Sequence, residues 1–191
     1  MPSFHHNLIL GYHGCEKALA KSLILGEQPM EPSINKYDWL GSGIYFWEGD
    51  AKRAYEFAKD TKKCDEPFVV GAILSLGYCF DLTSREDLDL LKFGWESVVV
   101  PSIGEGIVNK PANKGENGEL MLRYLDCYVI NALHEFNKST GIRQFDSVRG
   151  AFWEGEEVYP TAGFREKSHI QLCICNSDCI LGLFLPKGYS F

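Results

Sequence analysis

The chain has 191 residues, of which 45% are hydrophobic and 24% are charged. These proportions are typical of a folded protein, so we expect a single domain spanning residues 1–191 rather than a disordered chain. The sequence contains no apolar run of about 18 residues, which a membrane span needs, and its first residues lack the charged-then-apolar order of a signal peptide. We therefore expect a cytoplasmic protein without a membrane partner.

The charge and the cysteines exclude further classes. The net charge is -7 and no run of Lys or Arg occurs, which argues against broad, salt-driven binding of nucleic acid but leaves room for a small basic groove. The seven cysteines are an odd number and include no C-x-x-C pair. This spacing argues against a disulfide framework and against a zinc site, so we expect reduced thiols and no metal.

Local patterns predict the secondary structure. Apolar runs with β-branched and aromatic residues indicate strands, while apolar residues at helical spacing indicate helices, with caps at Asp50 and Ser84 and stops at Gly26 and Gly141. Asp87 follows Ser84 by three residues, as in a capping box. The predicted elements are strand 8–14, helix 16–25, strand 44–47, helix 51–59, strand 68–76, helix 85–92, helix 120–137, strand 145–152, strand 168–175 and strand 179–186.

Two long loops interrupt this pattern. Residues 101–119 are polar and rich in Gly and Pro, which predicts a mobile surface loop, and residues 153–167 form an acidic loop. The strand after the acidic loop alternates apolar and polar residues, so we expect one of its faces to carry His169, Gln171, Cys173 and Cys175. Helices dominate the first two thirds and strands the end, which predicts an α+β fold around a mainly antiparallel sheet.

The segment from Asp38 to Glu48 combines a glycine turn with an aromatic strand, a pattern that suits the binding of a flat ligand. Gly41-Ser42-Gly43 allows a close approach of the backbone to a flat group, and Ile44-Tyr45-Phe46-Trp47 follows as an aromatic strand. A buried strand entered through a tight glycine turn would explain the same segment without any ligand. The spacing alone leaves both interpretations open.

The order of motifs adds a family resemblance. His13-Gly14 ends the first strand, Gly41-Ser42-Gly43-Ile44-Tyr45-Phe46 begins the second, and a helix, an apolar strand and a late strand with a polar residue follow. This order resembles the ADP-ribosyltransferase superfamily, in its poly-ADP-ribose-polymerase-like or diphtheria-toxin-like branch, which carries a His-Tyr-Glu signature. The resemblance implies a split antiparallel β-sheet with flanking helices, NAD as the substrate and nicotinamide as the leaving group.

The resemblance assigns roles to residues at the matching positions. His13 matches the histidine that hydrogen-bonds a ribose of NAD, and Gly14 matches the glycine whose backbone holds the carboxamide. Tyr45 matches the tyrosine that stacks on the nicotinamide ring, with Ser42 and Gly43 lining the cofactor beside it. A serine and a second stacking tyrosine of the family are replaced here by Arg53 and Glu56, although a shift in register would place Tyr55 as the second ring.

The third signature position departs from the family, because the late strand carries no glutamate. Gln171 is the match, with His169 two residues before it on the expected cleft face. An amide can hydrogen-bond a ribose hydroxyl but cannot act as a base, which favours transfer of a single ADP-ribose unit over chain elongation. Alternatively Glu154, Glu156 or Glu166 folds in to supply a carboxylate, with Glu166 the first choice.

The implied function is mono-ADP-ribosyl transfer from NAD to a protein or nucleic acid, as in toxin and phage-defence members of the superfamily, with an antitoxin as a further expected partner. Arg149 is a candidate for contact with the pyrophosphate or the target, or a plain surface arginine. Glu166 and His169 are candidates for contact with the acceptor. Two alternatives stay open. An NAD glycohydrolase would need the same residues. A catalytically silent module that binds NAD or ADP-ribose is favoured if Gln171 stands where an ancestral glutamate was lost.

Overall fold

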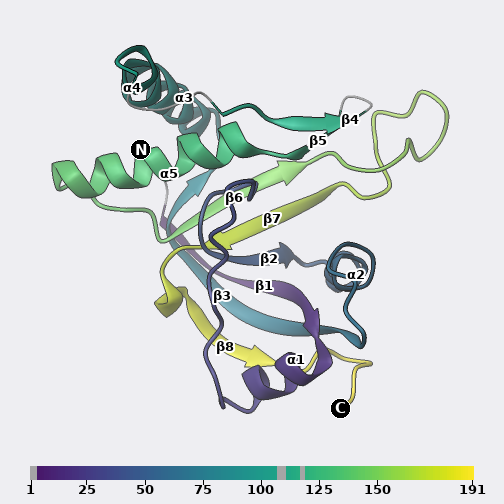
Figure 1. Cartoon of the computed structure of the whole chain (residues 1–191). Helices are drawn as coiled ribbons and strands as arrows, with labels where there is room; N and C mark the ends of the chain where they lie inside the picture. The colour runs from purple at the N-terminus through teal and green to yellow at the C-terminus, as the bar shows by residue number, and fades with distance from the viewer. Residues whose placement is uncertain (1–3, 107–110, 117–118) are drawn as a thin grey trace.

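The computed structural model describes residues 4–106, 111–116 and 119–191 (Figure 1). A central sheet carries helices on both sides: α3, α4 and α5 lie together beside β6, whereas α1 lies beside β8 near the C-terminus. The elements are β1 (Phe4–Glu16), α1 (Lys17–Ile24), β2 (Ile44–Glu48), α2 (Ala51–Glu56), η1 (Phe57–Thr61), β3 (Pro67–Asp81), α3 (Arg85–Phe93), η2 (Gly94–Val99), α4 (Val100–Gly104), β4 (Lys114–Glu116), β5 (Glu119–Leu122), α5 (Tyr124–Thr140), β6 (Ser147–Phe152), β7 (His169–Ile174), η3 (Ser177–Cys179) and β8 (Ile180–Phe184).

The main sheet is mixed. Its strand order is β1-β2-β7-β6-β3-β8, with an additional pairing between β1 and β3. All pairs are antiparallel except β3 with β6, so the expected α+β class and mainly antiparallel sheet are confirmed at this level. β4 and β5 form a separate two-stranded hairpin.

The long strand β3 closes the sheet. Its first part pairs with β1 on one side and with β8 on the other, and its last residues, Cys79 to Asp81, pair with β6. The strands β1, β2, β7, β6 and β3 therefore follow one another around a ring. The junction of β1 with β2 is short, since it consists of the pairs Gly11–Glu48 and Tyr12–Trp47.

Two buried clusters lie on opposite faces of β2 and β7. Phe46, Leu172 and Ile174 pack with Ala72 and Leu74 of β3 on one face. On the other face, Cys173 packs with a cluster supplied largely by α5, β3 and β6, whose buried members are Leu40, Phe80, Ile130, Leu133, Phe145, Val148 and Phe152. The alternation between the faces confirms the period-two pattern predicted for the strand after the acidic loop.

The helix boundaries follow local chemistry. Asp50 caps α2 as predicted, since its Oδ1 accepts a hydrogen bond from the backbone N–H of Arg53 at 2.8 Å. Gly141 ends α5 with a left-handed φ of 70°. The capping box predicted at Ser84 is wrong: Ser84 precedes α3 without a side-chain hydrogen bond, and Asp87 instead accepts from the backbone N–H of Asp81 at 2.8 Å.

Two predictions for the middle of the chain are also wrong in part. Residues 101–119 were expected to be a loop, but the segment begins in α4 and contains β4, while 107–110 and 117–118 lie outside the described residues. The helix expected from Leu120 begins at Tyr124, because residues 119–122 pair with β4 as the strand β5. Cross-strand pairing, which a helical pattern does not reveal, decides this boundary. Among the described residues, no helix has the length and apolar character needed to cross a bilayer.

Candidate functional site

The strands β2 and β7 bring Tyr45 and Gln171 to one face of the sheet, whereas the side chain of His13 lies on the other face of β2. β2 pairs with β7 so that Tyr45 lies opposite Cys173 and Trp47 lies opposite Gln171. Directly opposed residues of antiparallel strands point to the same face, so the side chains of Tyr45 and Gln171 share one face of the sheet. His13 lies on β1, where its Nδ1 donates a hydrogen bond to the carbonyl oxygen of Tyr45 at 2.8 Å.

His13 contacts the backbone of Tyr45 rather than its ring. The imidazole lies edge-on to Phe46 with the ring centroids 5.9 Å apart, on the side of β2 opposite to the Tyr45 ring. Burial is the main cause that lowers the pKa of His13 to about 4, and the nearby charge of Lys62 lowers it further. The imidazole is therefore neutral near pH 7, and because Nδ1 carries the proton, Nε2 is an acceptor.

The hydroxyl of Tyr45 is engaged by the turn before it. It donates to the carbonyl oxygen of Gly41 at 2.6 Å and accepts from the backbone N–H of Leu40 at 2.9 Å. Burial raises the pKa of this phenol well above its ordinary value. These bonds fix the Tyr45 ring against the second buried cluster and tie it to the turn of residues 41–43.

Gln171 is buried and polar. Its side chain is 9% exposed, and its amide has no hydrogen-bond partner among the described residues. The fully buried polar atoms without a partner belong to Trp47, Arg53 and His169, so the amide of Gln171 keeps some exposure to solvent and is open to a ligand. The same sheet face carries Trp47 opposite Gln171 on β2 and Gly150 opposite it on β6.

A buried ion pair lies next to Gln171. Arg53 of α2 donates through Nη2 to Oε1 of Glu154 at 2.6 Å, and both side chains are about 90% buried. The other oxygen of Glu154 lies 3.8 Å from Nδ1 of His169, which precedes Gln171 by two residues on the same face. Of the loop glutamates considered from the sequence, Glu154 is the buried one, whereas Glu156 and Glu166 are exposed.

Three buried nitrogen atoms of this cluster lack hydrogen-bond partners in the described part of the chain: Nε1 of Trp47, Nε of Arg53 and Nε2 of His169. His169 donates from Nδ1 to the carbonyl oxygen of Lys167 at 2.8 Å, which leaves Nε2 as an acceptor. Burial lowers the pKa of His169, so its imidazole is neutral near pH 7. Two donors and one acceptor therefore lie buried without partners beside the amide of Gln171.

Several other expected site residues serve the packing. A Cβ on Gly14 would lie 2.0 Å from the backbone oxygen of Ala54, so α2 rests directly on this glycine. A Cβ on Gly43 would lie 2.5 Å from Sγ of Cys173, so the approach of β7 also requires glycine there. The N–H of Ser42 donates to Oδ1 of Asn131 at 2.9 Å.

The remaining candidates, Tyr55 and Arg149, are held by contacts within the protein. Tyr55 is half-buried and packs with the cluster around Trp47. Arg149 lies on the opposite face of β6 from Gly150, where it bonds Glu48 through Nε at 2.7 Å and Asp81 through Nη1 at 3.1 Å. The guanidinium of Arg149 is thus occupied by two carboxylates rather than presented to a ligand.

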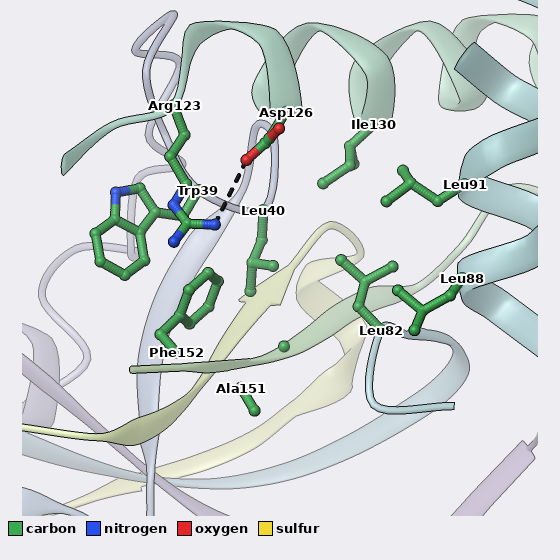
Figure 2. Close-up of a pocket in the computed structure, with 11 residues that line it drawn as sticks. Trp39, Leu40, Leu82, Leu88, Leu91, Arg123, Asp126, Ile130, Ala151 and Phe152 are labelled. Atoms are coloured by element: carbon green, nitrogen blue, oxygen red, sulfur yellow. Dashed lines mark hydrogen bonds and ion pairs between the residues drawn. The ribbon is translucent and has the colours of Figure 1, made fainter. Parts of the chain in front are cut away.

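A pocket of about 230 Å³ lies between β6 and the helices α3 and α5 (Figure 2). Gly150 in its lining sits beside Gln171 in the register, but His13, Tyr45 and Gln171 do not line it. At one end, the guanidinium of Arg123 lies over the rings of Trp39 and Phe152, at 4.6 and 4.9 Å from their centroids. The lining consists of Trp39, Leu40, Leu82, Leu88, Leu91, Arg123, Asp126, Ile130, Gly150, Ala151 and Phe152.

Sequence reasoning missed Trp47 and the pairing of Arg53 with Glu154. In the sequence, Trp47 stood out only as one residue of an aromatic strand. Arg53 stood out only because it occupies the position of a serine in the family that the chain resembles. The described residues hold no group of three or more side chains suited to a metal ion. Neither the scan of protein-family models nor the search of curated proteins gave a match for this chain.

Proposed function

We propose that this protein is an NAD-dependent mono-ADP-ribosyltransferase with the split sheet of that superfamily, which releases nicotinamide and transfers ADP-ribose to a protein or nucleic acid. The observation that carries the proposal is the sheet face that Tyr45 and Gln171 share, on which the amide of Gln171 makes no hydrogen bond to the described residues. The short junction between β1 and β2, with His13 beside it, is consistent with a split sheet.

The proposed chemistry is displacement at C1′ of the nicotinamide ribose through an oxocarbenium-like transition state. Tyr45 stacks on the nicotinamide ring, and the amide of Gln171 hydrogen-bonds a ribose hydroxyl. The carboxylate of Glu154 lies on the same face and stabilises the positive charge that develops on the sugar. His13 lies on the other face of β2, against Phe46, so it takes no part in holding this ribose.

The ion pair with Arg53 holds Glu154 in place. The sequence matched the third position to Gln171 and offered Glu166 as the first alternative source of a carboxylate. We propose Glu154 in place of Glu166 for that carboxylate, because Glu166 is exposed in the loop. His169 lies between Glu154 and Gln171 on this face. Its Nε2 is buried, so it would accept a proton from an acceptor nucleophile only after substrate binding has opened this face.

The test uses NAD labelled in the nicotinamide and, separately, in the adenylate. Purified protein is incubated with each label, with and without cell lysate. Released nicotinamide together with adenylate label retained on macromolecules supports the transferase. Free ADP-ribose as the product identifies a glycohydrolase instead, binding without release identifies a silent module, and the absence of both binding and release overturns the assignment to NAD.

Variants at Gln171 and Tyr45 locate the site. Gln171→Ala should lower the rate of nicotinamide release by about 10- to 100-fold, the value of one hydrogen bond to the ligand, while Gln171→Glu keeps the acceptor and retains activity. Tyr45→Ala should abolish activity, whereas Tyr45→Phe keeps the stacking ring. Glu166→Gln is the matched control for Glu154→Gln, and only the latter should reduce the rate. Equal rates for Tyr45→Ala and the unmodified protein would reject this site.

A further inference from the structure

A second chemically distinct cluster lies at the end of β7, on the side of α5. Sγ of Cys175 is 3.8 Å from Nε2 of His134, a distance at which a thiol and an imidazole share a proton. Cys173, two residues earlier, is fully buried and also contacts Cys175 through its thiol. A histidine beside a cysteine is the arrangement that activates a thiolate as a nucleophile.

Cys175 also differs from the other cysteines in exposure. All seven cysteines are free thiols, and five of them are buried. Only Cys64 and Cys175 are partly exposed, and the charged groups that act on Cys64 in the described part of the chain are Glu16 and Lys62 rather than a histidine. Cys64 is therefore an internal standard that is less deeply buried than Cys175 and whose pKa is shifted in the opposite direction, so accessibility alone would favour reaction at Cys64.

We propose that Cys175 is a modification site that reacts with small-molecule disulfides, with His134 as the group that activates its thiol. The thiolate of Cys175 attacks one sulfur of the disulfide, the new S–S bond forms and the S–S bond of the reagent breaks. The departing thiolate takes the electron pair and receives the proton held by His134. Cys175 ends as a mixed disulfide, and half of the reagent ends as a free thiol, so the exchange is balanced without another oxidant.

The electrostatic environment agrees with this geometry. A hydrogen bond from the thiol of Cys173 is the main cause that lowers the pKa of Cys175, and the contact with His134 lowers it further. Burial raises the pKa of Cys64, and the carboxylate of Glu16 adds to that shift. The two partly exposed thiols are thus shifted in opposite directions.

The modification has a defined structural consequence. Sγ of Cys175 lies 3.8 Å from the carbonyl oxygen of Ser42, and the turn of residues 41–43 also holds the hydroxyl of Tyr45 through Gly41. A group added to Cys175 meets this turn, because the thiol already lies against Ser42. The turn has little room to move away, since Gly43 packs against Cys173. We therefore expect the adduct to loosen the turn and release the Tyr45 hydroxyl, and its effect on NAD chemistry rests on the function proposed above.

The first experiment measures thiol reactivity and needs no NAD. The folded protein is treated with hydroxyethyl disulfide, or with iodoacetamide in a parallel series, from pH 5 to pH 9, and each cysteine is quantified by peptide mass spectrometry. At pH 7 Cys175 should react at least tenfold faster than Cys64, with a pH midpoint below that of Cys64. His134→Gln should slow Cys175 and move its midpoint up, while the rate at Cys64 stays unchanged as the check on folding.

Equal rates for Cys175 and Cys64 in the unmodified protein would overturn the proposal, as would a His134→Gln variant with unchanged reactivity at Cys175. The second experiment follows hydrogen exchange after modification. The amide of Ser42, which donates to Asn131 at 2.9 Å, should exchange faster in the adduct but not in treated Cys175→Ser protein. Unchanged exchange at Ser42 would reject the coupling to the turn, whether or not the protein uses NAD.

Discussion

At His13, burial and the charge of Lys62 act on the imidazole in the same direction, and both disfavour its protonated form. The folded-state pKa is about 4, below the ordinary value of 6.5, so between these values the unfolded chain binds a proton that the folded chain does not. Stability is therefore present above about pH 6.5 and is lost as the pH falls toward 4. His169 is shifted in the same direction and contributes to the same loss.

We expect the free energy of unfolding to decrease by up to about 3 kcal/mol between pH 6.5 and pH 4 because of His13, which is the shift in pKa converted to free energy. The measurement is urea unfolding at half-unit pH steps. His13→Gln cannot take up the proton, so its stability should change less over this interval. Parallel pH curves for the variant and the unmodified protein would contradict the assignment to His13.

At the scale of elements, the contact of α2 with β1 depends on Gly14. From the resemblance we expected the backbone of this glycine to bind the carboxamide of NAD. In the structure, the backbone oxygen of Ala54 covers the Cα of Gly14. Lys62 also reaches the carbonyl oxygen of Gly14, at 3.4 Å. A ligand could reach the Cα side of Gly14 only if α2 shifted.

Gly14→Ala should destabilise the protein by about 1–3 kcal/mol, since a Cβ there would overlap the helix backbone. Gly182→Ala is the matched control: Gly182 also lies in a strand, but a Cβ there would meet no atom within 4 Å. The control should be neutral or slightly stabilising. Equal midpoints of thermal unfolding for both variants would show that α2 does not rest on Gly14.

At the scale of the whole molecule, Arg149 connects strands that are far apart in the sequence. It bonds Glu48 at the end of β2 and Asp81 at the end of β3, while it lies on β6 itself. The strands β2, β3 and β6 all belong to the ring of paired strands. The ion pairs of Arg149 therefore stabilise the part of the sheet where β3 pairs with β6. The hydrogen bonds to Glu48 and the ion pairs raise the pKa of Arg149, which stays charged.

Arg149→Ala removes an ion-pair partner from the buried carboxylate of Asp81 and from the half-buried carboxylate of Glu48, and should cost about 2 kcal/mol of stability in urea unfolding. Arg149→Lys keeps the positive charge and should recover part of this loss. The recovery should be incomplete, because an ammonium cannot hold both carboxylates in the planar geometry of a guanidinium. Lys52→Ala, which removes an exposed ion pair to Glu56, is the control and should change stability by less than about 0.5 kcal/mol. A small effect of Arg149→Ala on stability with a large one on NAD affinity would instead support a ligand contact.

The sequence by itself determined the elements whose signals are local. The aromatic strand after the glycine turn, the cap at Asp50, the stop at Gly141 and the alternation from His169 to Cys175 all appear where they were predicted, because short-range sterics and hydrogen bonds fix them. The predicted capping box at Ser84 is wrong, because the carboxylate of Asp87 accepts a hydrogen bond from the backbone N–H of Asp81 instead. The start of α5 was misplaced since residues 119–122 pair with β4.

Only the tertiary structure decided which side chains meet. The sequence offered three loop glutamates, and the fold buried Glu154 against Arg53, 101 residues away along the chain. It likewise turned Arg149 toward Glu48 and Asp81, and placed His134 beside Cys175. Such contacts depend on strand register and helix docking, which sum many weak interactions between distant segments, and no local pattern carries that information.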